Sequence, residues 1–472
     1  MTGSSTFTHI VGTEIEHRVY DLTGGVTPSV LRAKLEKLSW PYGVWSLGAH
    51  RGTNGCRAYF DAASIIEYAG PECTNGTDAM YYEIAGSLFW ARMASLCERS
   101  LGNDAQAWVI KANTSAHGVS SGGHHTNISM PMVADSYKVN FFASVRQLKA
   151  LVATLQLISG SGVVLPREAA DTRLGTPEYG YAISARGSHV SRDAGPAFST
   201  SEQGGKPLFL ERNEPLADSA QFWRLQICGL DSNILPAAIQ LKLDILLIMA
   251  EMAAMDAIDP IKLIEDPALG HSARRVSLDW RTPLETADHG TLTALEIQWH
   301  YYHEAEEYVL GHREGRGIDI LEQWADILIA FDTDEDVPAA LNGKVDWVTK
   351  ALMLQRLAVK SDRPLTCDAA EHLHLKYHAY QFNASGSCLP VLLAQRYGSP
   401  DLAQHVLHAM RVAPSDTRAC ARGAFAALRL PDSRIDWEYV QALETPRFKM
   451  PDPSIPTTKE FRQFRRHLRK AA

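Results

Sequence analysis

The chain has 472 residues, of which 45% are hydrophobic and 21% charged, a composition typical of a folded globular protein. Its net charge of -8 argues against nucleic acid as a partner, because nucleic-acid binding relies on a surface rich in Lys and Arg. Seven cysteines without CxxC spacing, and an N-terminus without an apolar signal segment, predict a cytoplasmic protein without disulfide bonds or a cysteine zinc site.

The first part of the chain predicts strands and tight turns around a few helices. Alternating apolar and polar residues predict a strand over 9–22, and a second strand-like segment covers 56–63. Apolar residues at helical spacing predict helices over 82–101 and 140–158. The second helix is expected to end at the Gly-rich segment 159–162.

The middle of the chain is predicted to be a loop region followed by helices. Residues 168–205 are rich in Gly, Ser, Pro and Arg, which predicts a loop region that covers an active site. Helices are expected over 219–255, 292–330 and 346–359. A strand is expected over 372–378, whose histidines lack a carboxylate or cysteine partner and are interpreted as structural rather than zinc ligands.

Two domains are expected in this α+β chain. The longest apolar run, residues 239–255, contains three charged residues, so we expect a buried helix rather than a membrane span. Residues 1–400 are long enough for a large catalytic domain, and residues 401–472, which end in a basic segment, are predicted to form a small C-terminal domain.

Acidic side chains gather on the first predicted strands. Glu14 and Glu16 are two residues apart, so both carboxylates project from the same face of a strand. Two like charges on one face need a cation between them or a shifted pKa. Tyr59 and Asp61 repeat this spacing, and Glu67 follows closely. Because Mg²⁺ prefers carboxylate oxygens and accompanies nucleotide phosphates, this set predicts an ATP site, with a solvated acidic face as the alternative.

Residues 122–129, GGHHTNIS, predict an extended stretch that carries several polar groups. The two glycines permit close approach to the backbone. His125, Asn127 and Ser129 supply a ring nitrogen, an amide and a hydroxyl. A neutral imidazole can complete a metal shell or hydrogen-bond a phosphate, whereas the alternative is a loop with exposed histidines.

A series of motifs between about residues 10 and 440 resembles the Pup ligase and Pup deamidase/depupylase family of actinobacterial proteasome systems. In chain order they are GTEIE, NGCRAYFDAASIIEYAGPE, SGSG, ISARGS, LFLERNEPLADSAQFWRLQICGLDSN, DPIKLIEDPAL, TLTALEIQ, KVDWVTK, LHLKYH and TRACARG. The resemblance implies the fold of the glutamine synthetase and carboxylate-amine ligase superfamily. In that fold a curved antiparallel sheet, flanked by helices, forms a cradle for ATP and Mg²⁺, and a small C-terminal domain packs beside it.

The resemblance also implies a role for individual residues. Asp61 corresponds to the aspartate that acts as catalytic base or nucleophile. The residues that correspond to the metal shell are Glu14, Glu16, Tyr59 and Glu67. Nucleotide and phosphate contacts are assigned to Arg186, Arg212, Arg224 and Ser129, and to the paired Arg274 and Arg275. Substrate contacts are assigned to the two arginines of the TRAxxRG motif, Arg418 and Arg422.

The chain departs from the family pattern at two places. The family has His-Glu-Asn where this chain has His125, Thr126 and Asn127, and it has a histidine where this chain has Leu216. The stretch GHHTNIS is similar instead to GCHTNFS of eukaryotic-type glutamine synthetases, in which the histidine binds metal and the asparagine contacts the amino-acid substrate. By the same comparison, Glu211 is expected to replace a glutamate that those enzymes supply to the metal.

The expected reaction is the ATP- and Mg²⁺-dependent joining of a carboxylate to an amine. ATP first phosphorylates the carboxylate, while Mg²⁺ and arginines neutralise the transferred charge. Asp61 then accepts the proton of the attacking amine. The substrates implied by the resemblance are a Pup-like protein and a lysine, or a small amino acid and an amine. The departures favour a small or specialised substrate, and neither nucleic acid nor a membrane is expected as a partner.

Two alternative functions stay open. An amidase of the deamidase type uses the aspartate directly on an amide. A homologue that binds a Pup-like tail or a nucleotide without turnover does not need Asp61 at all. Pup deamidases carry a long insertion between the first glutamate pair and the catalytic aspartate, whereas a modest segment joins Glu16 to Asp61 here. The spacing therefore favours the ligase.

Overall fold

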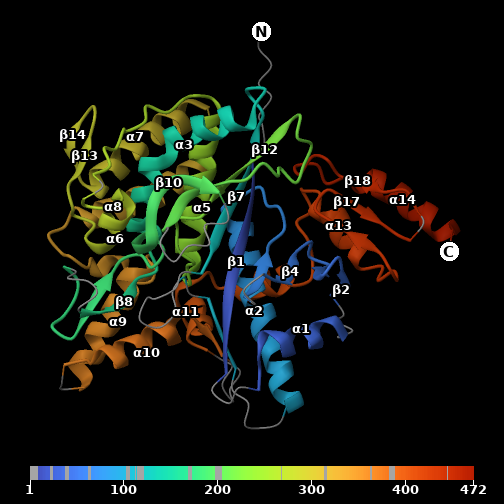
Figure 1. Cartoon of the computed structure of the whole chain (residues 1–472), viewed down its shortest axis with the longest axis horizontal. Coiled ribbons are helices and arrows are strands. Elements are labelled where there is room, and N and C mark those ends of the chain that lie inside the picture. Colours follow the sequence, from blue (N-terminus) through green and yellow to red (C-terminus); the bar gives the residue numbers. More distant parts are fainter. Residues whose placement is uncertain are drawn as a thin grey trace.

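A long central strand, with a large sheet built around it, organises the molecule (Figure 1). The computed structural model describes residues 9–471 except for 22–24, 38–41, 62–64, 102–106, 112, 114–121, 168–172, 197–204, 267, 313–315, 362–363, 382–387 and 444. Within these residues, eleven strands form one sheet whose main path runs β10-β11-β12-β7-β1-β5-β4-β3-β2, with β6 joining β1 to β15. All of its strand pairs are antiparallel except β10 with β11.

The strands of this sheet are β1 (Ile10–Asp21), β2 (Gly43–Ser46), β3 (Ala49–Gly52), β4 (Arg57–Phe60), β5 (Ile66–Ala69), β6 (Ala107–Ile110), β7 (His124–Pro131), β10 (Val190–Pro196), β11 (Lys206–Glu211), β12 (Phe222–Ile227) and β15 (Ala379–Tyr380). Smaller sheets contain β8 (Val163–Pro166) with β9 (Tyr179–Ala182), β13 (Leu284–Thr286) with β14 (Gly290–Leu292), and β16 (Arg434–Ile435), β17 (Tyr439–Gln441) and β18 (Phe448–Lys449).

The helices are α1 (Pro28–Lys37), α2 (Gly76–Leu101), α3 (Tyr137–Thr154), α4 (Gln156–Ser159), α5 (Pro236–Ala254), α6 (Ser272–Leu278), α7 (Ala294–His312), α8 (Arg316–Phe331), α9 (Asp346–Ser361), α10 (Cys367–His378), α11 (Leu389–Tyr397), α12 (Leu402–Ala409), α13 (Ala419–Ala426) and α14 (Thr458–Ala471). The described residues also include the short 3₁₀ helices η3 (Gly187–His189) and η4 (Ala339–Leu341).

Register on β1 decides which side chains meet on one face of the sheet. Glu14 lies opposite His125 of β7 on one side and Ala69 of β5 on the other, and Glu16 lies opposite Glu67. Along β1 and β7 buried and partly exposed residues alternate, as expected for strands with one face on the core and one on a cavity.

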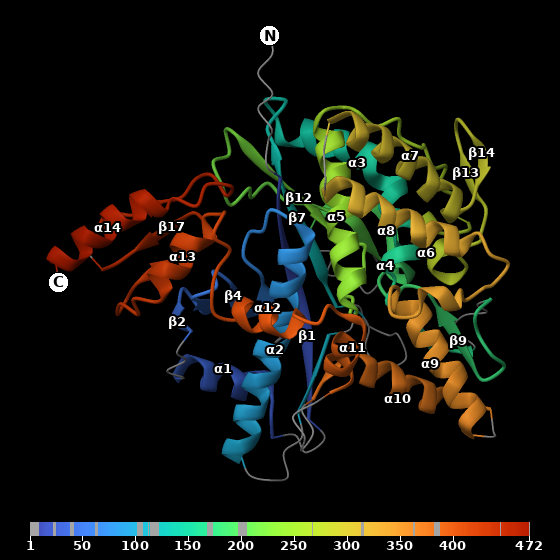
Figure 2. The same ribbon diagram turned by 180° about the vertical axis from the view of Figure 1, so that it is seen from behind.

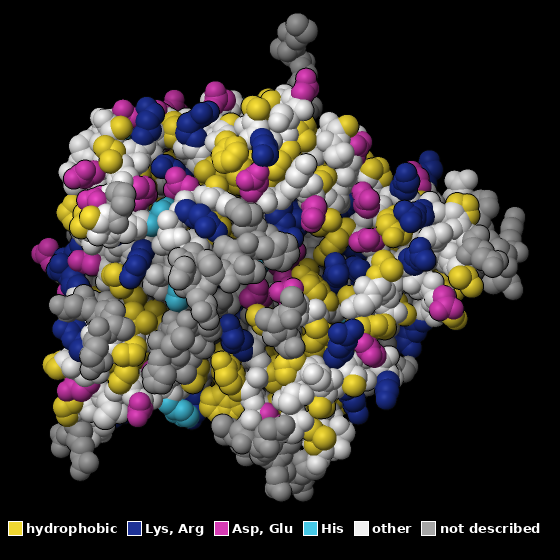
Figure 3. All heavy atoms as spheres, viewed as in Figure 1, with side chains coloured by type: hydrophobic (Ala, Val, Ile, Leu, Met, Phe, Trp, Pro, Cys, Tyr) yellow, Lys and Arg dark blue, Asp and Glu magenta, His cyan; other side chains and the backbone are white. Residues whose placement is uncertain are grey.

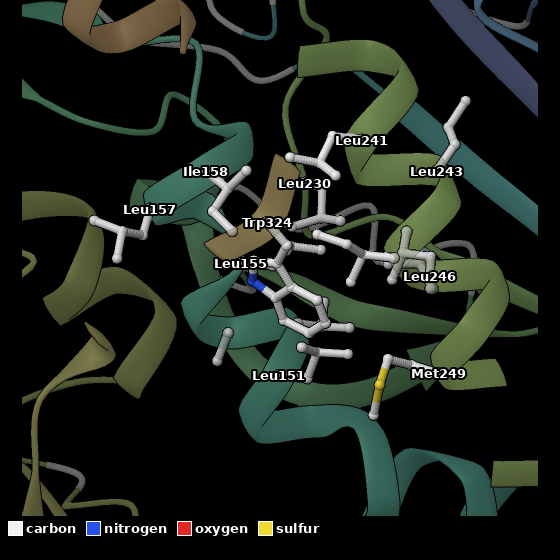
Figure 4. Packing of buried hydrophobic residues seen from close by; sticks show 14 of the residues in the cluster. Leu151, Leu155, Leu157, Ile158, Leu230, Leu241, Leu243, Leu246, Met249 and Trp324 are labelled. Atoms are coloured by element: carbon white, nitrogen blue, oxygen red, sulfur yellow. The ribbon is translucent and has the colours of Figure 1, made fainter. Parts of the chain in front are cut away.

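The other face of the sheet is covered by helices. Figure 2 shows α2 and α5 running side by side across β1 and β7, with α3 and α7 beyond them. The large core forms there, and Figure 4 shows the fully buried Trp324 among Leu151, Leu155, Leu230 and Met249. Almost every residue of α5 is buried, which explains its long apolar run. No described helix combines the length and apolarity needed to cross a bilayer.

The C-terminal residues form a small unit with its own core. Phe425 of α13, Ile435, Val440 and Phe461 of α14 belong to one buried cluster, separate from the large core. In Figure 1 this unit lies beside the strands β2 to β4, on the side away from the helical body. By contrast α12 packs on α2 and contributes Leu402 and other residues to the large core.

Several expected elements are confirmed, among them the strand at β1 and the helices α2, α7, α8 and α9. The helix expected over 140–158 is interrupted at Leu155, between α3 and α4. Of the expected loop region 168–205, residues 168–172 and 197–204 lie outside the described residues, and the rest contains β9, η3 and β10.

Two expected elements are wrong. Residues 222–227, expected within a helix, form the strand β12; both of its faces are buried, so its sequence shows no alternation. Residues 372–378, expected as a strand, belong to α10. There His374 and His378, four residues apart, both accept hydrogen bonds from the buried Lys350, at 3.0 and 2.8 Å. The lysine occupies the position between the rings that a zinc ion would need, so the histidines are structural, as expected.

Candidate active site

The concave face of the large sheet carries a cavity of about 480 Å³. Because side chains alternate along a strand, Glu14 and Glu16 of β1 project from this face together with His125 of β7. Tyr59 of β4 and Glu67 of β5 reach the cavity from the neighbouring strands. Figure 3 shows acidic side chains near the middle of this side of the molecule, with Lys and Arg side chains around them.

Three of these groups are close enough to share a cation. Donor atoms of Glu14, Glu67 and His125 all lie within 4.8 Å of one another. His125 Nδ1 is 3.4 Å from a Glu14 carboxylate oxygen. Glu16 is held nearby, because its carboxylate accepts a hydrogen bond from the backbone N–H of Gly123. Two carboxylates and an imidazole form a donor set that suits a divalent cation.

The pKa values of the two clustered glutamates move in opposite directions. Burial, and the nearby charges of Glu14 and Glu16, raise the pKa of Glu67 well above its ordinary value. Burial also acts to raise the pKa of Glu14, but the hydrogen bond and charge of His125, together with Arg224 and Arg212, lower it to about 2. Glu67 thus lies in an excess of negative charge that a bound cation relieves.

Asp61 lies at the mouth of the cavity. It follows the last residue of β4, is exposed, and its backbone N–H donates a hydrogen bond to Ile65 O at 2.9 Å. Its side chain lines the same cavity as the glutamates and Tyr59. Burial raises the pKa of the Tyr59 hydroxyl, with Glu14 and Glu67 adding to the effect, so this group is a neutral hydrogen-bond donor.

Three of the arginines that the sequence predicts for the site line the cavity. Arg212 and Arg224 lie close to Glu14. Arg224 Nη2 is also 3.6 Å from a carboxylate oxygen of Glu214. Arg186, which precedes η3, is only 3% exposed. Its Nε donates to Cys228 O at 2.7 Å and its Nη1 donates to Gly122 O at 3.0 Å, which fixes the direction of its guanidinium.

A second, smaller cavity of about 80 Å³ adjoins the first. It contains the predicted residues Asn127, Ser129 and Arg418, and it shares the side chains of Glu14 and Arg224 with the larger cavity. Most of its lining is apolar. Its position beside the carboxylate cluster gives the site two compartments.

Five predicted site residues are placed elsewhere or are already engaged. Glu211 projects from the opposite face of β11 toward α3, where it lies 3.7 Å from Lys138, so its assignment to the metal shell is not supported by the geometry. Arg274 and Arg275 lie on α6 and do not line either cavity; Arg275 donates to Pro283 O at 2.7 Å.

Arg418 and Arg422 both bind the protein itself. Their guanidinium groups contact the buried Glu72, with Arg418 Nε 2.8 Å from its Oε1. Arg418 also donates to Met450 O and Leu216 O, and Arg422 to Gly55 O. Arg418 and Arg422 therefore attach the C-terminal unit to the main body, and their guanidinium groups are already occupied by these protein contacts.

The sequence reasoning missed several cavity residues. Arg57, at the same period-2 spacing as Tyr59, lies 4.4 Å over its ring, and Lys206 begins β11. Burial and the neighbouring Arg186 lower the pKa of Lys206. Asp436 and Trp437 reach the cavity from the C-terminal unit. The period-2 spacing could have predicted Arg57. Asp436 and Trp437 could not be predicted in this way, because they lie far along the chain and reach the cavity only through the packing of the C-terminal unit.

Comparisons with known proteins agree with this geometry. The chain matches the Pup-ligase protein family over residues 20–441. It is 29% identical to a Pup–protein ligase of Kineococcus radiotolerans over 415 residues, which is 82% of this chain and 83% of that protein. It is 30% identical to a Pup–protein ligase of Corynebacterium efficiens over 387 residues, 78% of this chain and 75% of that protein.

Solved structures extend the similarity to nearly the whole fold. The ligase PafA in complex with the prokaryotic ubiquitin-like protein Pup superposes with a TM-score of 0.81 and 26% identity, covering 98% of this chain and 93% of PafA. PafA in complex with ADP gives a TM-score of 0.76 at 26% identity, with 94% and 93% covered. The expected α+β fold, with a curved sheet flanked by helices, is thereby confirmed. The chain belongs to the Pup-ligase protein family and, like the ligases of that family, is an ATP-dependent amide-forming ligase.

Proposed function

We propose that this ligase uses ATP and Mg²⁺ to join the side-chain carboxylate of a terminal glutamate, carried by a Pup-like protein, to a lysine amine of a target protein. The reaction proceeds through an acyl phosphate. The observation that carries the proposal is the single cavity that combines the Glu14, Glu67 and His125 cluster with Asp61 and four arginines. Near-complete coverage of PafA in its complex with Pup supports a Pup-like partner over a small amino acid.

The donor set fits Mg²⁺ as the metal. Glu14, Glu67 and His125 would hold the ion, with Glu16 and Tyr59 beside them. Burial, together with the negative charges of Glu14 and Glu16, raises the pKa of Glu67, and a bound cation would relieve this cost. When bound, a divalent cation neutralises phosphate oxygens and orients them for transfer.

The remaining residues have separate roles in forming the amide bond. Arg212 and Arg224, beside Glu14, bind the phosphates of the nucleotide and stabilise the charge that develops during transfer. Asp61, exposed at the mouth, accepts a proton from the incoming ammonium group and so prepares the amine for attack on the acyl phosphate. An exposed base suits an acceptor that arrives from solvent on a large protein.

The test is ATP turnover by the purified chain with Mg²⁺, across a Pup-like peptide ending in glutamate, free amino acids and lysine-bearing acceptors. We expect ADP and phosphate only when both a carboxylate and an amine are present. Asp61→Asn is expected to reduce product formation by roughly a hundred- to ten-thousand-fold, the usual contribution of a general base. The control Asp288→Asn changes a carboxylate that lies on the surface beside Lys262 and is expected to be silent.

Other outcomes support other functions. Turnover with a free amino acid but not with the peptide would replace the Pup-like donor by a small one. Bound ATP that is never consumed, together with cleavage of a peptide amide, would favour the amidase. If nucleotide and peptide both bind but no reaction occurs, the result would favour a homologue that binds without turnover.

A further inference from the structure

The start of β7 holds several side chains of the site through its backbone. Gly123 N donates a hydrogen bond to the Glu16 carboxylate, and the backbone N–H of Glu16 donates to Gly123 O at 3.1 Å. Gly122 O accepts from Arg186 Nη1 at 3.0 Å. A Cβ atom on Gly123 would lie 2.7 Å from Glu16 Oε1 and 2.8 Å from His125 Nε2, so the backbone itself is packed against these groups. A small shift of this segment therefore changes the site.

The opposite face of the same strand carries a histidine that the cavity chemistry does not use. Because side chains alternate along β7, His125 points into the cavity and His124 into the interior, where it is fully buried. His124 Nε2 lies 3.3 Å from a carboxylate oxygen of Glu83 on α2. Lys242 Nζ is 3.4 Å from the same nitrogen but has two shorter hydrogen bonds to other oxygens, both of 2.8 Å. A carboxylate can only accept, so the His124 ring donates to Glu83.

Glu83 is itself fixed from a second side. Its other oxygen accepts from Lys111 Nζ at 2.7 Å, and Lys111 also donates to Asn233 O at 2.6 Å. Glu83, Lys111 and His124 are all 0% exposed. Burial acts to raise the pKa of Glu83, but Lys111 and His124 hold it well below its ordinary value, so Glu83 is an anion. Burying an ion pair adds little net stability, because desolvation offsets much of the attraction, so these charges call for a role other than stability.

We infer that Glu83 is a positioning residue for the metal cluster of Glu14, Glu67 and His125. By holding the His124 ring on the interior side of β7, it fixes the place and direction of His125 on the cavity side. This inference rests on the proposed function, in which the cluster holds Mg²⁺. Glu83 contacts neither the metal nor a substrate, so its loss should lower the affinity for the cation and leave kcat at saturating Mg²⁺ close to that of the native chain.

The test measures metal binding directly as well as turnover. Mn²⁺, which suits the same carboxylate ligands as Mg²⁺, is titrated with the purified chain, and free Mn²⁺ is followed by electron paramagnetic resonance. The Mg²⁺ concentration that gives half-maximal ATP turnover is measured in parallel. Glu83→Gln keeps the size of the side chain and removes its charge. It should weaken Mn²⁺ binding and raise the Mg²⁺ requirement by roughly ten- to a hundred-fold, the range for a residue that orients a metal ligand.

Further variants separate positioning from stability. Asp244→Asn also changes a buried carboxylate, which accepts from Gly76 N at 2.8 Å at the start of α2, and it should lower the thermal midpoint without changing metal affinity. If Glu83→Gln fails to fold, His124→Phe replaces it in the test. This variant keeps a ring, leaves the pair of Glu83 with Lys111 intact, and should show the same loss of metal. His124→Gln should restore binding, because an amide N–H can replace the ring N–H.

The outcomes separate the inference from the proposed function. Weaker Mn²⁺ binding in Glu83→Gln or His124→Phe, with Asp244→Asn unchanged, supports the positioning role. The role is overturned if folded Glu83→Gln binds Mn²⁺ as tightly as the native chain, if Asp244→Asn loses as much affinity, or if His124→Gln is as weak as His124→Phe. A native chain whose Mn²⁺ binding depends on Glu83 but which never consumes ATP would keep the positioning role and contradict the ligase reaction. A native chain that neither binds Mn²⁺ nor needs Mg²⁺ would contradict both.

Discussion

A single buried carboxylate, Asp231, organises the segment that carries Arg186. Its two oxygens accept hydrogen bonds from the backbone N–H groups of Ser161, Ala185 and Arg186, at 2.6, 3.0 and 2.6 Å. They also accept the hydroxyl groups of Ser161 and Ser184. Asp231 does not line the cavity, so it acts on the site through the position of Arg186.

Replacing Asp231 by Asn is expected to impair the reaction through Arg186. The amide keeps one acceptor oxygen and leaves buried donors unpaired, which should cost about 1 to 3 kcal/mol of folding free energy. We expect kcat/KM to fall by roughly ten- to a hundred-fold. A double-mutant cycle with Arg186→Lys checks the mechanism, because residues that act as one unit give non-additive losses. Additive losses would give Asp231 a purely structural role.

At this scale the sequence predicts residues that share one strand face. Glu14 and Glu16 are two residues apart on β1, so their position on one face could be anticipated, whereas His125 of β7 is connected with the metal through the resemblance to glutamine synthetases. Trp437 could not be placed, because its position depends on how the C-terminal unit packs on the sheet. Glu211 is assigned to the metal shell by comparison with glutamine synthetases. Its side chain instead points toward α3, where it lies near Lys138.

At the scale of elements, ion pairs join Glu72, which lies between β5 and α2, to Arg418 and Arg422 of the TRAxxRG motif at α13. Burial acts to raise the pKa of Glu72, but Arg422 and Arg418 lower it to about 2 from an ordinary 4.5. Because the folded-state pKa is the lower one, this pair stabilises the protein fully above pH 4.5, and the contribution is lost as the pH falls toward 2.

The ion pairs of Glu72 with Arg418 and Arg422 predict that the native chain and a Glu72 variant lose different amounts of stability in acid. At 1.36 kcal/mol per pKa unit, protonating Glu72 should remove about 3 kcal/mol between pH 4.5 and 2. Glu72→Gln is expected to be less stable at neutral pH, because it leaves two buried arginines unpaired, and to lose less stability on acidification than the native chain. Denaturant unfolding across this pH range measures both effects, with the exposed Glu36→Gln as control. Parallel pH profiles for Glu72→Gln and the native chain would contradict the assignment.

The same scale shows where sequence patterns are informative. Elements with one exposed face, such as β1 and α9, carry a clear period and are predicted correctly. β12 is buried on both faces, and its run FWRLQI fits a helix or a strand equally well. In α10 the alternating histidines suggest a strand, but only His374 and His378 face Lys350, at the spacing of one helical turn.

At the scale of the whole molecule, two cores determine how the chain divides. Residues 401–472 are predicted as the C-terminal domain, yet α12 at their start packs on α2. Leu402 and Val406 are buried in the large core at 5% and 4% exposure. Beyond α12, Thr53 Oγ1 donates to Arg411 O and Tyr82 OH donates to Val412 O, which ties this segment to the main body.

Two truncations are therefore expected to behave differently. A chain that ends after Ala413 keeps the large core intact and should stay folded, while it loses the cavity residues Asp436 and Trp437 and hence activity. A chain that ends at Pro400 also loses Leu402 and Val406, whose burial contributes about 3 to 6 kcal/mol. Thermal unfolding followed by circular dichroism should show a lower midpoint for the shorter chain. Equal midpoints would mean that the division falls at residue 400, and an unfolded longer chain would mean that the two cores are stable only together.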